Sequence, residues 1–216
     1  MNGEREGSAL ILAHGLWLGG WALQRLARRL RAAGRSDVRI FSWPTISHGL
    51  DANAQNLRAF ADHLEADRID WIGHSLGGVL ILRMLAGWPD APPGRIVCLG
   101  SPLTGSRSAE RLARVGPGRR LTGRSIADGV LATSAAEWCP PELAARTGVI
   151  AGSRGMGAGR LLGRLDPPHD GTVRVAETEL PGLADHLVLN VTHTGLLFSR
   201  AAAGAAETFL REGKFA

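Results

Sequence analysis

The sequence predicts an α/β fold, a three-layer sandwich in which about six mostly parallel strands form one sheet with helices on both faces. Three observations predict it. Short apolar runs alternate along the chain with longer segments of helical spacing, an order typical of parallel pairing. The runs are apolar throughout, as strands are when both faces of their sheet are covered. The 216 residues, 44% of them hydrophobic, suffice for one domain with a large core.

The first half of the chain contains three strand–helix units. In each unit a short apolar run precedes a segment whose apolar residues recur at helical spacing. The first helix stops at a glycine, and the second begins at Asp51, a common capping residue. The predicted strands are Ala9–His14, Asp37–Trp43 and Arg68–Gly73, and the helices that follow them are Trp21–Gly34, Asp51–Ala66 and Leu76–Trp88.

The second half continues the alternation with one interruption. No linker, internal repeat or low-complexity tract divides the chain, so residues 1–216 are predicted to form a single domain. Residues 106–138 are a candidate small cap, because the pattern up to Trp138 is unclear after its first helix. The predicted strands are Arg95–Ser101, Gly148–Ser153 and His186–Val191, and the helices are Ser108–Val115 and the terminal Thr194–Glu212.

Composition excludes several classes of protein. The formal charge is +5 and Lys214 is the only lysine, but the arginines form no stripe with interleaved aromatics, so we expect no nucleic-acid binding. No apolar run approaches the length of a membrane span, so we expect no stable membrane insertion. The first apolar run is too short for a signal peptide and follows acidic residues. Cys98 and Cys139 are expected to be free thiols, which favours a cytoplasmic location.

Sites in open α/β sheets form at the carboxyl ends of the strands. That rule selects candidate residues before any motif is considered. The polar residues just past the predicted strand ends are His14, His48, Ser75, Ser101, Ser153, Asp166, Asp170 and His193.

Ser75 stands between a strand and a helix in the pattern G-x-S-x-G, as Gly73-His74-Ser75-Leu76-Gly77. In such a turn the serine adopts a strained backbone conformation that exposes its Oγ, and the glycines allow the strand and helix to approach closely. The N–H of Leu76, at the start of the helix, can meet a developing oxyanion. These features predict that Ser75 is a nucleophile.

A serine nucleophile needs a base, and His193 has the best position for it. It follows the apolar run "HLVLNV" directly and precedes the last helix. His14 has a competing role in "AHGLWLGGW", where a histidine is more often a structural hydrogen-bonding group. There the backbone after Gly15 offers the N–H of Leu16 as a second oxyanion donor.

The acid that orients the base is expected between the serine and the histidine, in a loop after a strand. "LDPPHDGTVRV" offers Asp166 and Asp170. We favour Asp170, because a tight loop before glycine fixes the angle of a carboxylate, whereas Asp166 precedes two prolines and serves equally well to begin a turn. Glu177 and Asp185 are weaker alternatives.

These motifs together resemble the α/β-hydrolase family, and more narrowly its small serine esterases and lipases. The resemblance rests on five pieces in order: "ILAHGLWLGGW", "GHSLGG", "LGSPLTGS", "DGTV" and "THTGLLFS". It implies a minimal α/β-hydrolase fold. It also implies Ser75 as nucleophile, Asp170 as acid, His193 as base, and Leu16 and Leu76 as oxyanion-hole donors.

The resulting expectation is a carboxylic ester hydrolase that acts through an acyl-enzyme on a small-molecule ester, with no metal or organic cofactor. The same triad also serves thioesterases, amidases, acyltransferases and lipases of longer-chain lipids, and a binding protein without turnover is a further alternative. Apolar residues are expected to surround Ser75 and to favour a short- to medium-length uncharged acyl chain. They are Leu16, Trp17, Leu18, Trp43, Leu103 and Leu196, of which Trp17, Leu103 and Leu196 are the chosen substrate-binding candidates.

Overall fold

The computed structural model describes residues 7–114, 123–156 and 165–215. These residues form one sheet of six strands, all parallel, in the order β2-β1-β3-β4-β5-β6. The predicted fold class is confirmed, and each predicted strand lies within two residues of its observed bounds. The strands are β1 (Ser8–Ala13), β2 (Val38–Phe41), β3 (Arg68–His74), β4 (Ile96–Leu99), β5 (Thr147–Gly152) and β6 (Asp185–Leu189).

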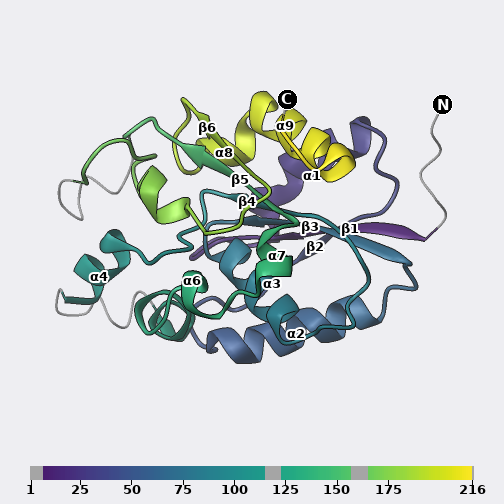
Figure 1. Cartoon of the computed structure of the whole chain (residues 1–216), viewed down its shortest axis with the longest axis horizontal. Helices are drawn as coiled ribbons and strands as arrows, with labels where there is room; N and C mark the ends of the chain where they lie inside the picture. Colours follow the sequence, from purple (N-terminus) through teal and green to yellow (C-terminus); the bar gives the residue numbers. More distant parts are fainter. Residues whose placement is uncertain (1–6, 115–122, 157–164, 216) are drawn as a thin grey trace.

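Helices cover both faces of the sheet (Figure 1). On one face lie α1 (Gln24–Ala32), α8 (Gly195–Phe198) and α9 (Arg200–Glu212). On the other lie α2 (Leu50–Asp62) and α3 (Leu76–Ala86). Each layer has its own apolar core: Leu26, Leu30 and Phe209 are buried in the first, and Leu57 and Leu80 in the second.

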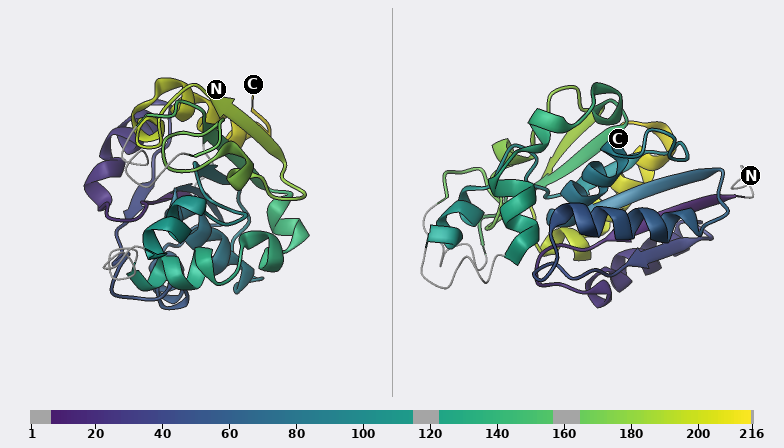
Figure 2. Two further views of the ribbon diagram at one scale, coloured as in Figure 1. Left: turned by 90° about the vertical axis from the view of Figure 1, so that its left-hand side faces the viewer. Right: turned by 90° about the horizontal axis from the view of Figure 1, so that it is seen from below.

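The interrupted stretch of the sequence contains short helices. They are α4 (Arg107–Arg114), a π-helical turn η2 (Ala127–Leu131), α6 (Ala135–Trp138) and α7 (Pro141–Ala144). The predicted helix over 108–115 is α4, displaced by one residue, and Val115 lies outside the described residues together with 116–122. Figure 1 and the right-hand view of Figure 2 place α4 beyond the carboxyl ends of the strands.

The terminal helix differs from the prediction because it divides at Ser199. That residue is extended, with φ −73° and ψ 131°, and its side chain accepts a hydrogen bond from the N–H of Ala202. Serine is a strong N-cap, so it ends α8 and begins α9 in a segment that otherwise favours one continuous helix. Two single-turn 3-10 helices complete the described elements, η1 (Gly20–Leu23) before α1 and η4 (Val175–Thr178) before β6.

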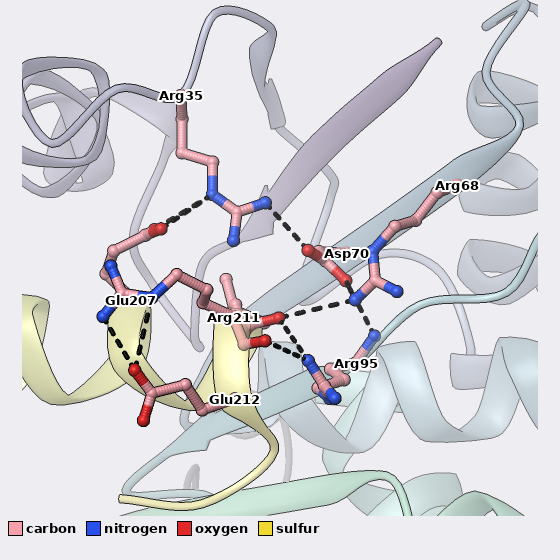
Figure 3. Close-up of polar contacts among 8 residues, drawn as sticks. Arg35, Arg68, Asp70, Arg95, Glu207, Arg211 and Glu212 are labelled. Carbon is pink, nitrogen blue, oxygen red and sulfur yellow. Dashed lines mark hydrogen bonds and ion pairs between the residues drawn. The ribbon is translucent and has the colours of Figure 1, made fainter. Parts of the chain in front are cut away.

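A buried carboxylate secures the amino end of β3 (Figure 3). Asp70 lies 2.8 Å from Arg35 Nη1 and 2.6 Å from Arg68 Nη2, and it accepts the backbone N–H of Arg95. Arg35 also pairs with Glu207 of α9. One carboxylate therefore joins the sheet to the last helix and to the loop after α1.

The topology determines where a site can form. From β1 the chain moves to β2 on one side and then to β3 on the other, so the strand order reverses at β1 and β3. The crevice outside the carboxyl ends at such a reversal is the usual binding site of an open α/β sheet. Ala13 is level with Gly73, and His74 with Leu99, so the residues that follow these strands meet there.

Candidate active site

Ser75 occupies a sharp turn between β3 and α3. Its φ is 55° and its ψ −125°, a left-handed conformation that is strained for any residue with a side chain. Its N–H donates to the carbonyl of Leu99, and its own carbonyl accepts from Gly78. The strained turn that the G-x-S-x-G pattern predicts is therefore present.

The glycines beside Ser75 are required by close backbone contacts. A Cβ at Gly73 would lie 2.3 Å from Gly78 Cα, and one at Gly77 would lie 2.3 Å from the carbonyl oxygen of Ala13. Gly15 lies against the serine itself, because a Cβ there would lie 2.8 Å from Ser75 Cβ. Any side chain at these positions would separate α3 or the β1 loop from the turn.

Asp170 and His193 form a polar pair, and His193 lines the same cavity as Ser75. His193 Nδ1 lies 2.7 Å from Asp170 Oδ2, and both side chains are buried. The other carboxylate oxygen accepts the N–H groups of Thr172 and Val173 at 2.8 and 2.7 Å. Since a carboxylate only accepts, Nδ1 of His193 carries the hydrogen and Nε2 keeps its lone pair. The carboxylate is thus fixed from three directions.

Gly100 makes room for that pair. Its φ is +59°, and a Cβ there would lie 3.2 Å from both Asp170 Oδ2 and His193 Nδ1. The alternative acids lie elsewhere. Asp166 is largely exposed and pairs with Arg174, Glu177 accepts from Arg107 and Arg174, and Asp185 accepts from the N–H groups of His186 and Phe215.

The loop after β1 contains the candidate oxyanion donor Leu16. Leu18 N–H bonds to the Gly15 carbonyl, and Trp17 has a φ of 59° within this turn. Trp17 N–H bonds to Thr45, whereas no hydrogen bond of the described residues uses the N–H of Leu16. Leu76 is the first residue of α3, so its N–H has no partner inside the helix. Both candidate oxyanion donors line the same cavity as Ser75.

His14 has the structural role that the sequence favoured. Nε2 accepts the N–H of Trp43 at 3.2 Å and Nδ1 lies 2.9 Å from the Gly15 carbonyl, so Nδ1 carries the hydrogen. Its ring stacks on Trp43, and burial lowers the pKa of His14. This neutral imidazole anchors the loop that carries Leu16.

His74 contacts both the backbone carbonyl and the ring of His193. Its Nε2 lies 3.0 Å from the backbone carbonyl of His193, and the ring centroids are 4.8 Å apart. Burial, followed by the neighbouring His193, lowers the pKa of His74 to about 3. His74 is therefore neutral and donates through Nε2. The sequence identified this residue only as part of the turn, and no periodicity indicates its contact with a loop 119 residues away.

The other polar residues at strand ends do not join the site. His48 is exposed beside Ser47, and Ser153 bonds to the carbonyl of Leu189. Ser101 is fully buried, and a Cβ at Gly78 of α3 would lie 2.2 Å from its Oγ.

A cavity of about 250 Å³ lies over Ser75. Its lining includes Ser75, His74 and His193, together with Leu16, Trp17 and Leu18 of the loop after β1. Other lining residues come from the candidate cap and the loop after Asp170. They are Ser106, Ser108, Ala109, Leu112, Ile126, Thr172 and Val173. No Asp, Glu, Lys or Arg is among the described residues that line it, so the cavity suits an uncharged group.

Two of the three substrate-binding candidates do not reach this cavity. Trp17 lines it and is 53% exposed, but Leu103 and Leu196 are fully buried and are absent from its described lining. Leu103 is held by a hydrogen bond from its N–H to the Glu177 carbonyl, and Leu196 packs against Gly100. Trp43, which was also expected near Ser75, is buried against His14. The segment "LGSPLTGS", on which the resemblance partly rests, contributes Pro102 and Ser106 to the lining, whereas Ala109, Leu112 and Ile126 were not among the predicted lining residues.

Within the described part of the chain, no three His, Cys, Asp or Glu side chains lie close enough together to hold a metal ion. Cys98 and Cys139 are free, and burial raises the pKa of the Cys98 thiol to about 12 and that of Cys139 to about 11. None of the described helices is long and apolar enough to cross a bilayer.

Fold, strand order and a strained serine at the reversal of the sheet define a hydrolase of the α/β class. The chain belongs to the alpha/beta hydrolase family, whose model matches residues 10–208. No curated protein matches the sequence.

Solved structures with similar folds include proteins named as a lipase, a pyrethroid hydrolase and a carboxyl esterase. The mature lipase BlEst2 of Bacillus licheniformis superposes with a TM-score of 0.68 at 18% identity, over 90% of this chain and 88% of the lipase. A pyrethroid hydrolase from Sphingobium faniae gives 0.67 at 16% identity, over 95% and 98% of the two chains. The metagenomic carboxyl esterase MGS0156 gives 0.65 at 21% identity, over 88% of this chain and 65% of the esterase. At these identities the likeness shows a shared fold.

Proposed function

We propose that the protein is a serine hydrolase that cleaves carboxylic esters with short- to medium-length uncharged acyl chains. One observation carries the proposal. Ser75, in its left-handed turn, and His193, bonded to Asp170, line the same small cavity. A nucleophile, a base and a group that orients the base are the components of acyl transfer through an acyl-enzyme.

In the first half of the reaction, Ser75 Oγ attacks the carbonyl carbon of the ester and Nε2 of His193 takes the hydroxyl proton. Asp170 holds the tautomer with hydrogen on Nδ1 and stabilises the imidazolium that forms. The N–H groups of Leu16 and Leu76 bind the oxyanion. His193 then returns the proton to the leaving alcohol as the carbon–oxygen bond breaks.

In the second half, water attacks the acyl-enzyme and gives a proton to His193. The tetrahedral intermediate collapses, the carboxylic acid leaves, and the proton returns to Ser75 Oγ. These steps use only groups of the chain, the ester and water.

The cavity and the comparisons support an ester as the substrate. The described lining includes no Asp, Glu, Lys or Arg, and 250 Å³ is below the range of about 300–1,000 Å³ found for drug-sized ligands. The structural neighbours named lipase, carboxyl esterase and pyrethroid hydrolase favour ester cleavage over amide cleavage. We place the enzyme in the cytoplasm, with a small-molecule ester as its partner.

A fluorophosphonate probe tests the proposal, because it labels only an activated serine. The wild-type protein should be labelled and Ser75→Ala should not, while Ser101→Ala, a matched serine at the next strand end, should label normally. Ser75→Ala should also lose several orders of magnitude in kcat on p-nitrophenyl esters, with little change in folding. Labelling or turnover that survives in purified Ser75→Ala would refute the assignment, and an unlabelled wild type would indicate a binding protein.

A further inference from the structure

Helix α1 presents arginines along one side. Arg25, Arg28 and Arg29 are spaced three and four positions apart, and Ala32 continues the row, so all four share one face of the helix. The opposite face, with Leu26, Ala27 and Leu30, is buried in the core. The row of guanidinium groups therefore lies on the outside of the molecule.

A fourth arginine joins this row from another helix. Arg200, at the start of α9, lines an open hollow of about 530 Å³ together with Arg25, Arg28, Arg29 and Ala32. Arg29 donates to the carbonyl of Phe198 at 2.6 Å, which joins α1 to the end of α8. No acidic residue is among the described residues that line the hollow.

The positive charge here is not neutralised within the described structure. Arg35, Arg83 and Arg174 each pair with carboxylates, whereas no ion pair among the described residues involves Arg25, Arg28 or Arg200. Desolvation, then the charges of Arg25 and Arg200, lower the pKa of Arg29. Like charges thus accumulate where an anion would relieve their repulsion.

Exposed aromatic side chains flank these arginines. Trp21 is 71% exposed, one helical turn before Arg25, and Phe198 is 47% exposed, two residues before Arg200. We call Trp21, Arg25, Arg28, Arg29, Phe198 and Arg200 the arginine surface. Aromatic rings beside basic residues are typical of proteins that lie at a membrane interface, where the rings settle among the headgroups.

Two segments connect the active-site cavity with the arginine surface along the chain. Trp17 lines the cavity and stands four residues before Trp21, a span of at most about 14 Å for an extended chain. Thr194 also lines the cavity and precedes Phe198 by the length of α8, a rise of about 6 Å. Residues of the arginine surface therefore follow lining residues closely in both segments.

We infer that the arginine surface docks the protein onto membranes rich in anionic lipid. A soluble anion is a poorer fit, because the guanidinium groups lie on an open helix face rather than converging on a buried polar group. This inference goes beyond the proposed function and does not depend on it, because docking needs no turnover.

Sedimentation with vesicles tests the inference. The full-length protein should bind phosphatidylcholine vesicles that contain phosphatidylglycerol and should not bind pure phosphatidylcholine, and high salt should weaken binding. An arginine near an anionic surface strengthens binding about five-fold, so the double variant Arg25→Gln/Arg28→Gln should bind about 25-fold more weakly. The control Arg39→Gln/Arg211→Gln removes the same charge from exposed positions elsewhere and should bind nearly as well as wild type.

Tryptophan fluorescence supplies an independent readout. Vesicle binding should shift the emission to shorter wavelength, and Trp21→Phe should lose much of the shift while still sedimenting with vesicles. Failure of the wild type to bind anionic vesicles, or equal losses in the two double variants, would overturn the inference. Displacement by millimolar inorganic phosphate at constant ionic strength would overturn it too, in favour of a soluble anion ligand.

Discussion

Nε2 of His74 donates a hydrogen bond to the backbone carbonyl of His193 across 3.0 Å. The residue before the candidate nucleophile thus holds the loop of the candidate base. The imidazole makes this contact in its neutral form, because burial inside the core lowers the pKa of His74 to about 3.

This buried imidazole predicts a loss of stability in acid. The unfolded chain takes up a proton near pH 6.5 and the folded chain does not until about pH 3. The contribution is therefore intact above pH 6.5 and is lost as the pH falls toward 3, by up to about 1.4 kcal/mol per pH unit. His74→Gln, which keeps an N–H donor, should show a shallower decline in the free energy of unfolding, measured by urea titration. The exposed His63→Gln should follow the wild type, and equal slopes for all three would contradict this account.

The second prediction separates the two aspartates of the acid loop. Asp170→Asn removes the acceptor that fixes Nδ1–H of His193, so kcat should fall by roughly 10⁴. Asp166 pairs with Arg174 at the surface, and Asp166→Asn should change kcat by less than about two-fold. Steady-state kinetics on one p-nitrophenyl ester measure kcat for both variants. A larger loss of kcat in Asp166→Asn than in Asp170→Asn would assign the orienting acid to Asp166 instead.

The third prediction concerns acyl chain length. Each CH₂ buried in the cavity adds about 0.8 kcal/mol until the space is filled. We therefore expect kcat/KM to rise from acetyl to about butyryl–octanoyl esters and then to level or fall, with no jump at the solubility limit. Ile126→Ala, which enlarges the cavity wall, should move the optimum to longer chains. A preference for palmitoyl esters with activation on emulsions would identify a lipase.

The fourth prediction compares two glycines. A methyl group at Gly77 would lie 2.3 Å from the carbonyl oxygen of Ala13, so Gly77→Ala should cost about 3 kcal/mol or more, or prevent folding. Gly204, in the middle of α9, has nothing within 4 Å of that position. Gly204→Ala should stabilise the protein by about 0.5–1 kcal/mol. Urea unfolding of the soluble variants measures both, and equal effects would contradict the contact at Gly77.

Local sequence patterns predicted most of the fold and the turn that contains Ser75. Continuous apolar runs located the strands because a parallel sheet is covered on both faces, and the glycines around Ser75 marked a turn that few other sequences can form. Asp170 was preferred over Asp166 for a local reason, the glycine that follows it. The division of the last helix at Ser199 was not predicted, because a serine within an apolar pattern does not by itself indicate a helix N-cap.

Local sequence patterns did not predict the contacts between segments that lie far apart in the sequence. Leu103 and Leu196 are apolar and follow strand ends, yet both pack inward, because apolarity alone does not distinguish a cavity wall from the core. Ala109 lies in a predicted helix and Ile126 in a stretch with no clear period, and neither pattern indicates that these residues line the cavity. The contact of His74 with the His193 carbonyl depends on how two loops meet in space.

Strand β3 carries Asp70 near its amino end and leads into Ser75 at the other. At about 3.3 Å per residue, the five steps from Asp70 to Ser75 span about 16 Å, beyond the distance at which substitutions usually influence each other. Directed evolution could therefore raise heat tolerance through the arginine–carboxylate cluster and select new substrates at the opposite rim, with neither campaign undoing the other. Strand β3 thus separates the cluster around Asp70, which affects stability, from the proposed nucleophile, so stability and activity can change independently.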